Sequence, residues 1–243
     1  EYVSQYSFLN LFNFITFRVG ASILTSLFFS LIFGQFIINK LSEIQPYGQP
    51  IRNDGPQNHI IKKAGTPTMG GLLILIGLFT GVFLWSDLNN PYNWLLFFIT
   101  FSFGTLGAFD DYKKIKSKNS HGISSKFKFL IQIIISLLSL IILYNYVDSD
   151  LTNNLYFPFF KNLVINLGWF FIPFYLFVIV GSSNAVNLTD GLDGLATVPV
   201  ILVAGCFAFI SYVSGNIIFS EYLLIPYIEG VGEVSVFCGA IIG

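Results

Sequence analysis

The chain has 243 residues, of which 54% are hydrophobic and only 10% are charged, and its formal net charge is −1. Soluble domains carry about 25% charged residues, so a chain this apolar lacks the polar side chains needed to cover a water-facing surface. The composition excludes an ordinary soluble domain. We expect the lipid bilayer to be its solvent and no nucleic acid among its partners.

Apolar runs long enough to span a bilayer recur along the whole chain. A bilayer core about 30 Å thick needs about 20 apolar residues in a helix. Such runs predict spans at 17–38, 69–85, 94–109, 127–146, 167–185 and 196–213, and the start of a seventh near Val231. The predicted fold class is all-α, a polytopic transmembrane helical bundle. Pro173 falls inside the fifth span, where we expect it to kink the helix.

Positive charge lies in alternate loops. Ten of the twelve Lys and Arg residues fall between the first two spans or around the loop between the third and fourth. Because cytoplasmic loops carry an excess of Lys and Arg, we expect a periplasmic N-terminus and cytoplasmic loops at about 40–68, 110–126 and 186–196. Every motif described below lies in these loops or at the helix ends beside them. The ten residues are Lys40, Arg52, Lys62, Lys63, Lys113, Lys114, Lys116, Lys118, Lys126 and Lys128.

The loop before the second span reads KKAGTPTMGG over 62–71. Thr66 can cap the following helix, and Pro67 suits its first position. A helix N-terminus flanked by lysines attracts phosphate, although an ordinary cap with lysines reaching the headgroups explains the same residues. A P-loop is excluded, because the Lys-Ser/Thr pair that should follow Gly70 is absent.

Two adjacent acids, Asp110 and Asp111, close the third span. The C-terminal end of a helix disfavours carboxylates, and neighbouring side chains diverge by about 100°, so one partner cannot easily serve both. If the helix continues, Lys114 comes within reach of either acid. The pair suits a divalent cation or a base acting on a phosphate; the alternative is a solvated salt-bridge cluster.

Polar residues recur every third position after the fifth span, at Asn184, Asn187, Asp190 and Asp193. This spacing places them along one edge of a helix or 3₁₀ turn. Two amides and two carboxylates suit hydrogen bonds to a nucleotide or contacts to a metal and phosphate; helix capping is the alternative. An EF-hand loop starting at Asn187 would need acidic or amide residues at its positions 3 and 5 and glycine at position 6. These positions hold Thr189, Gly191 and Leu192, so an EF-hand is excluded.

These motifs together resemble one family. The segments KKAGTPTMGG (62–71), FDDY (109–112) and NAVNLTDGLDGLA (184–196) resemble the signatures of the phospho-N-acetylmuramoyl-pentapeptide transferase family. Segments 49–52, 54–57, 225–227 and 236–240 extend the likeness in order along the chain. Each motif alone would be weak, but the set is specific.

The resemblance implies a bacterial cytoplasmic-membrane enzyme with ten helices when complete, in the superfamily of polyprenyl-phosphate N-acetylhexosamine-1-phosphate transferases. Such an enzyme transfers phospho-MurNAc-pentapeptide from UDP-MurNAc-pentapeptide to undecaprenyl phosphate, and releases UMP and lipid I for peptidoglycan synthesis. The resemblance also implies Mg²⁺ as cofactor and allows a homodimer. It makes residues 1–243 a single domain that we expect to be truncated at both ends.

The resemblance assigns roles to particular residues. Asp110 and Asp111 become the catalytic acids and candidate metal ligands, with Asp110 as the base toward the lipid phosphate. The family's remaining Mg²⁺ ligand and its histidine loop would lie beyond Gly243, so we expect this fragment alone to be inactive. The substrate-binding positions it implies are Lys63, Thr68, Lys114, Lys126, Asn184, Asn187, Asp190 and Asp193.

Three other functions compete with this interpretation. A sister transferase would share the acid pair and use another UDP-sugar. A transporter should place ionisable groups in the middle of the membrane, whereas these spans are nearly uncharged and their polar groups cluster at one side. A purely structural scaffold gives no reason for the polar residues after the fifth span.

Overall fold

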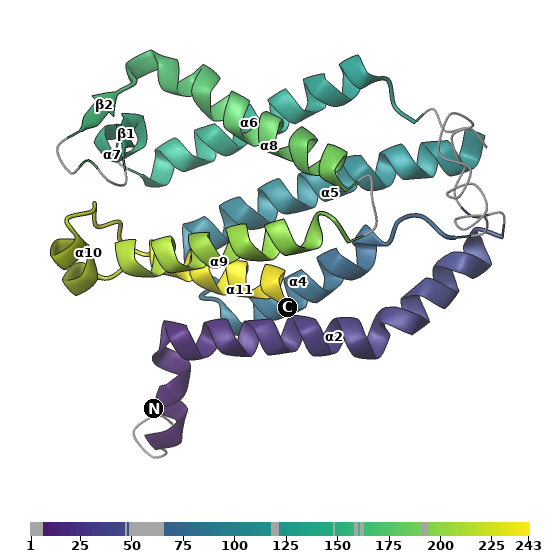
Figure 1. Ribbon diagram of the computed structural model, residues 1–243, viewed down its shortest axis with the longest axis horizontal. Helices are drawn as coiled ribbons and strands as arrows, with labels where there is room; N and C mark the ends of the chain where they lie inside the picture. Colours follow the sequence, from purple (N-terminus) through teal and green to yellow (C-terminus); the bar gives the residue numbers. More distant parts are fainter. Residues whose placement is uncertain are drawn as a thin grey trace.

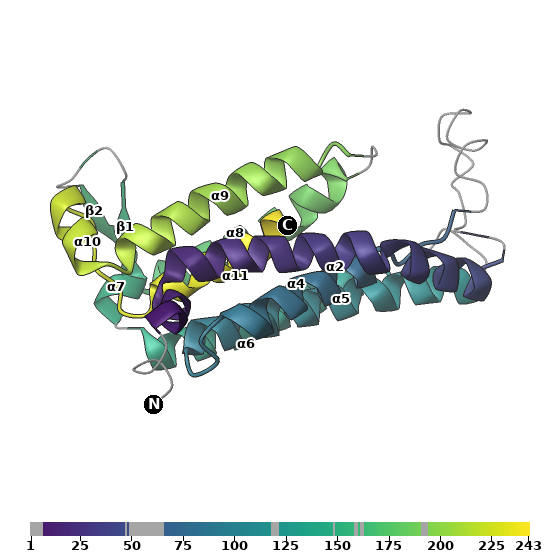
Figure 2. The same cartoon turned by 90° about the horizontal axis from the view of Figure 1, so that it is seen from below.

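The computed structural model describes residues 7–46, 48, 66–117, 122–147, 149–157, 160, 163–190 and 194–243. Long helices run side by side along the longest axis of the molecule (Figure 1). Seen from below, α9 and α6 lie on opposite sides of the bundle (Figure 2). The principal helices are α2 (Ile15–Ile44), α4 (Gly71–Trp85), α5 (Pro91–Ser117), α6 (Ser125–Tyr146), α8 (Phe171–Thr189), α9 (Thr197–Ser214) and α11 (Val234–Ile242).

Each predicted span corresponds to one of these helices, which confirms the all-α membrane bundle. Five described helices are long and apolar enough to cross a membrane; α4, with 15 residues, is shorter. The first and third spans extend further than the sequence indicated, to Ile44 and Ser117 instead of 38 and 109. These extensions are polar, so hydropathy alone ended the spans too early.

Large apolar side chains cover the outside of the bundle. Leu31 is 69% exposed and Phe209 is 64% exposed, which would be unfavourable for so many side chains in water. In lipid the same surface needs no covering, and helices satisfy their backbone hydrogen bonds internally. The exposed faces are therefore the surface that contacts acyl chains.

Small residues bring α2, α4 and α11 into close contact. A Cβ added at Gly81 would lie 3.1 Å from Ser22 Oγ and 3.2 Å from the Cβ of Ala240. The Ser22 hydroxyl donates a hydrogen bond to the carbonyl of Val236 at 3.1 Å. Helices in membranes associate through small residues and interhelical hydrogen bonds, so this crossing forms the tightly packed half of the bundle.

A buried ion pair joins the same helices at the end away from the acid pair. Arg18 at the start of α2 donates from Nη1 to Glu233 Oε2 at 2.8 Å, and the backbone N–H of Asp87 donates to that oxygen at 2.9 Å. Glu233 ends the turn η3 (Val231–Glu233), which leads into α11. A charge inside an apolar run needs such a partner, so the pair ties α2, the α4–α5 turn and α11 together.

Short elements that the sequence did not indicate lie at this same end. They are η1 (Ser7–Asn13), α7 (Ser149–Asn153), the antiparallel strands β1 (Asn154–Tyr156) and β2 (Val164–Asn166), and α10 (Ile217–Leu223). The turn η2 (Gly168–Phe170) precedes α8.

The kink was expected from a proline in the interior of the span, whereas Pro173 lies in the first turn of α8. Backbone N–H groups there have no partner within the helix, so proline removes no helical hydrogen bond.

Replacing Gly81 should separate the tightly packed helices. We expect Gly81→Leu to destabilise the protein by at least about 1 kcal/mol, because the new side chain collides with α2 and α11. The measurement is the thermal midpoint of unfolding in detergent. Gly205→Leu on α9 is the matched control, since nothing lies within 4 Å of a Cβ built there; equal midpoints for the two variants would contradict the packing argument.

Candidate functional site

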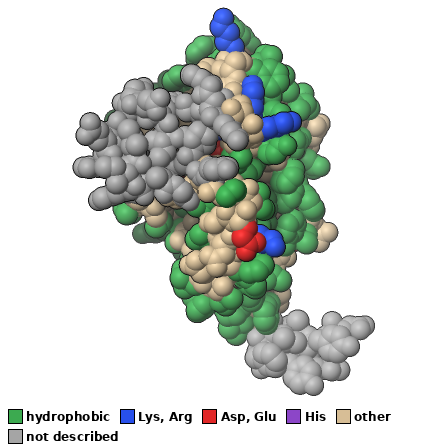
Figure 3. All heavy atoms as spheres, turned by 90° about the vertical axis from the view of Figure 1, so that its right-hand side faces the viewer, with side chains coloured by type: hydrophobic (Ala, Val, Ile, Leu, Met, Phe, Trp, Pro, Cys, Tyr) green, Lys and Arg blue, Asp and Glu red, His purple; other side chains and the backbone are tan. Residues whose placement is uncertain are grey.

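A cavity of about 1770 Å³ lies between α4, α5, α6 and α8. Four lysines and two aspartates line its polar part, and apolar side chains from the same helices line the remainder. On the end face of the bundle, basic side chains are visible together with acidic ones, among apolar and other residues (Figure 3). The charged residues that line the cavity are Asp110, Asp111, Lys113, Lys114, Lys126 and Lys128.

Lys114 joins the two adjacent acids of α5. Its Nζ lies 2.8 Å from Asp110 Oδ2 and 3.1 Å from Asp111 Oδ1. The helix continues to Ser117, so Lys114 is one turn beyond both acids, at the i+4 and i+3 positions. The pairing anticipated from the sequence is confirmed, but the expectation that one partner cannot easily serve both acids is wrong, because the long lysine side chain reaches between them.

The loop before α6 holds the second oxygen of Asp110. The backbone N–H of Ile123 donates to Asp110 Oδ1 at 2.7 Å. Gly122 approaches the carboxylate so closely that an added Cβ would collide with Oδ1 and lie 2.7 Å from Cγ. The Asp110 side chain is consequently only 12% exposed, whereas that of Asp111 is 28% exposed. Asp111 is the more accessible acid of the pair.

The segment before α4 reaches the same acids from another direction. The Thr68 hydroxyl donates to Asp111 Oδ2 at 2.8 Å, so residues 43 positions apart meet at the cavity rim. The expected cap at Thr66 with Pro67 in the first turn is wrong, because α4 begins at Gly71. Met69 adopts a left-handed conformation with φ of 70°, and helical conformation cannot continue through it.

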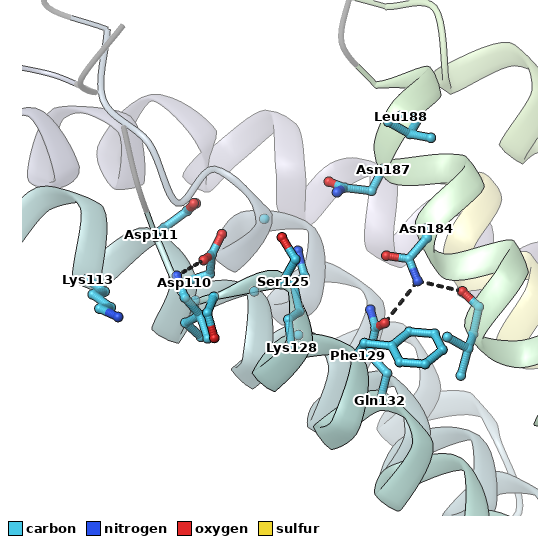
Figure 4. A pocket seen from close by; sticks show the side chains of 18 of the residues that line it. Asp110, Asp111, Lys113, Ser125, Lys128, Phe129, Gln132, Asn184, Asn187 and Leu188 are labelled. Carbon is cyan, nitrogen blue, oxygen red and sulfur yellow. Dashed lines mark hydrogen bonds between the residues drawn. The ribbon is translucent and has the colours of Figure 1, made fainter. Parts of the chain in front are cut away.

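Two amides of α8 face the acids across the cavity. Asn184 and Asn187 project from α8 toward the side formed by α5 and α6 (Figure 4). The Asn184 Nδ2 group donates to Gln132 Oε1 of α6 at 2.9 Å and to the carbonyl of Val180 at 2.8 Å. Because α8 continues to Thr189, both amides are held on a regular helix.

The remaining predicted residues are distributed differently. Lys126 lines the cavity. Asp190 follows the last residue of α8, is exposed, and is not among the described residues that line the cavity. Lys63 and Asp193 lie outside the described residues, so their roles stay predictions.

Metal-ligating side chains do not cluster in the described part of the chain. No group of three or more His, Cys, Asp and Glu residues gathers there to hold an ion. Mg²⁺, however, is commonly bound by one or two carboxylates together with substrate phosphates and water. Asp110 and Asp111 offer that donor set, so they fit a Mg²⁺ ion that arrives with a diphosphate.

Gln132 is a cavity residue that the sequence reasoning missed. It is 3% exposed, and Ser136 and Ser139 on the same helix are fully buried. With Lys128 these residues are spaced by four, four and three positions, which places them on one face of α6. The Ser139 hydroxyl lies 2.9 Å from the hydroxyl of Tyr175 on α8. A polar stripe at helical spacing inside an apolar span was the available signal.

Comparison with known proteins identifies relatives of the whole chain. Residues 93–237 match glycosyl transferase family 4, and residues 63–75 match the phospho-N-acetylmuramoyl-pentapeptide-transferase signature 1. A phospho-N-acetylmuramoyl-pentapeptide-transferase of Pelagibacter ubique (strain HTCC1062) is 64% identical over 243 residues. That alignment covers 100% of this chain and 67% of the relative.

A side chain at Gly122 should displace Asp110. We expect Gly122→Ala to break the hydrogen bond from Ile123 and to lower stability by about 1–3 kcal/mol. Hydrogen–deuterium exchange at the Ile123 amide should become faster. Gly181→Ala is the matched control, because Gly181 lines the same cavity with nothing within 4 Å of an added Cβ. Unchanged exchange at Ile123 in Gly122→Ala would show that the loop does not hold the carboxylate.

Proposed function

The chain belongs to the phospho-N-acetylmuramoyl-pentapeptide-transferase family, and from that premise we propose that it transfers phospho-MurNAc-pentapeptide from UDP-MurNAc-pentapeptide to undecaprenyl phosphate. The products are lipid I and UMP, and the step belongs to peptidoglycan synthesis. The chain is part of a multi-pass membrane protein, so a membrane-embedded acceptor reaches it from the bilayer.

One observation carries the proposal: three separate segments meet at one cavity at the basic end of the bundle. Thr68 contacts Asp111 at 2.8 Å, and Asn184 and Asn187 line the same cavity as the acid pair. Lys113, Lys114, Lys126 and Lys128 give this cavity more positive than negative side chains. Such a field favours ligands that carry several phosphate charges.

The reaction itself is a phosphoryl transfer. An oxygen of the lipid phosphate forms a bond to the sugar-linked phosphorus of the donor, and the bond from that phosphorus to the bridging oxygen breaks, which releases UMP. We propose that an acid of the pair, Asp110 in the first instance, accepts a proton from the lipid phosphate, so that the attacking oxygen carries negative charge. The lysines bind the phosphates and stabilise charge on their oxygens.

We include Mg²⁺ in the proposal because the two carboxylates of Asp110 and Asp111 are suitable ligands for it. When bound, the ion neutralises charge on the donor diphosphate. Asp111 is the more accessible candidate ligand, and Asp110 is the second. Among the described residues, the proposed substrate-binding residues are Thr68, Lys114, Lys126, Asn184, Asn187 and Asp190; Lys63 and Asp193 complete the proposed set.

We also propose the bacterial cytoplasmic membrane as the location, with a periplasmic N-terminus and a cytoplasmic active site. This orientation is supported by the lysines of α5 and α6, which lie at the same end of the bundle as the cavity, because basic residues favour the cytoplasmic side. A nucleotide-linked donor made in the cytoplasm would reach the cavity from this side. The homodimer allowed by the resemblance stays a prediction.

Removing either acid should abolish transfer. In the full-length protein reconstituted with both substrates, we expect Asp110→Asn and Asp111→Asn each to lower the rate of lipid I formation by at least about a hundredfold. The rate is measured by release of UMP and appearance of the lipid product. The variants should still insert in the membrane, because neither change adds a buried charge.

Asp87→Asn is the control for this test. Asp87 is exposed and lies in the turn between α4 and α5, at the opposite end of α5 from the cavity, so this variant should transfer at the parent rate. Unlabelled UDP-sugars that lack the peptide test the sister transferase: competition at concentrations similar to those of the peptide donor would favour another donor. Normal turnover by both acid variants would refute the assignment of the site.

A further inference from the structure

Gln45, the residue after α2, uses its whole side chain to hold Thr68. The side chain accepts a hydrogen bond at Oε1 from the Thr68 backbone N–H at 2.9 Å, and its Nε2 donates to the Thr68 carbonyl at 3.2 Å. Gln45 is only 4% exposed. A buried amide that pairs with both backbone groups of one residue fixes the position and the direction of that residue.

Thr68 stands beside a strained point of the chain. Met69 has a φ of 70°, a conformation that residues other than glycine adopt rarely and that persists only where surrounding contacts determine it. The Met69 carbonyl accepts a hydrogen bond from the N–H of Leu72 in the first turn of α4. The pairing with Gln45 thus secures one side of this turn, and α4 secures the other.

From Thr68 the contacts continue to the acids. The Thr68 hydroxyl donates to Asp111 Oδ2 at 2.8 Å. The other carboxylate oxygen of Asp111 forms an ion pair with Lys114 Nζ at 3.1 Å. Gln45 itself is not among the residues that line the cavity. Among the residues that the structure describes, the side-chain hydrogen bonds of Gln45 reach the site through Thr68.

We propose that Gln45 is a positioning residue of the transfer reaction, which holds Thr68 so that its hydroxyl orients the carboxylate of Asp111. The inference rests on the proposed function and adds to it a residue that touches neither substrate. A purely structural role for Gln45, in which it only attaches α2 to the loop before α4, would affect folding. The proposed role instead affects the orientation of Asp111 and depends on the Thr68 hydroxyl.

The test compares Gln45 variants in two backgrounds of the full-length protein. In the parent, we expect Gln45→Ala to lower kcat by about tenfold to a hundredfold, since a misdirected catalytic group costs rate more than binding. The loss in kcat should exceed any rise in KM, because Thr68 is also a proposed substrate-binding residue; a rise in KM with parent-like kcat would contradict the positioning role. Gln45→Met, which keeps the length of the side chain, should give the same loss and serves if the alanine variant does not fold.

The second background is Thr68→Val, which removes the hydroxyl and keeps the shape. There, Gln45→Ala should cause less than about a twofold further loss, because two residues that act through one contact are not additive. Gln35→Ala is the matched control: Gln35 is an exposed glutamine of α2, and its replacement should leave kcat unchanged.

Three results would overturn the inference. Parent-like kcat in both Gln45 variants would show that the orientation of Asp111 does not depend on the hydrogen bonds between Gln45 and Thr68. An equal loss from Gln45→Ala in both backgrounds would show that Gln45 acts independently of the Thr68 hydroxyl. A parent protein that forms no lipid I from UDP-MurNAc-pentapeptide would overturn the proposed function together with this inference, whereas an active parent separates the two.

Discussion

The site depends on the contact of one lysine with two neighbouring carboxylates. Asp110 and Asp111 lie nearly two turns before the end of α5 at Ser117, so the adjacent negative charges depend on a nearby cation and not on the helix end. Lys114 reaches both at 2.8 and 3.1 Å, so two acids and one cation share a small volume. The two oxygens that Lys114 does not contact each receive a different donor, the Ile123 N–H and the Thr68 hydroxyl. Loops before α4 and α6 are thereby brought to one point.

The bundle surrounds this point with two kinds of packing. On one side, α2, α4 and α11 approach closely through Gly81, Ser22 and Ala240. On the other side, α6 and α8 meet through polar pairs, including Gln132 with Asn184 at 2.9 Å. The cavity lies between the two sides. On the first side, Gln45 at the end of α2 holds Thr68, while the more polar half offers amides to a ligand.

Hydropathy and motif spacing predicted much of this arrangement. The seven apolar runs became seven helices, and Asp110, Asp111, Lys114, Asn184 and Asn187 all border the cavity. The errors have physical causes. The start of α4 was placed too early because the left-handed conformation of Met69 cannot be predicted from the residue type. Gln132 was overlooked although the polar stripe on α6 indicated it, and Gln45 was overlooked because a glutamine in the polar segment after α2 shows no partner until Thr68 packs against it.

The sequence by itself determined the number and type of the spans, since the thickness and polarity of a bilayer leave helices as the only solution for such apolar runs. It also determined which ends of those helices carry charge. Only the tertiary structure decided that Thr68 would meet Asp111 and that Gln132 would meet Asn184. These contacts join residues 43 and 52 positions apart, and they depend on helix rotation and crossing, which small residues at the interfaces set and which hydropathy does not record.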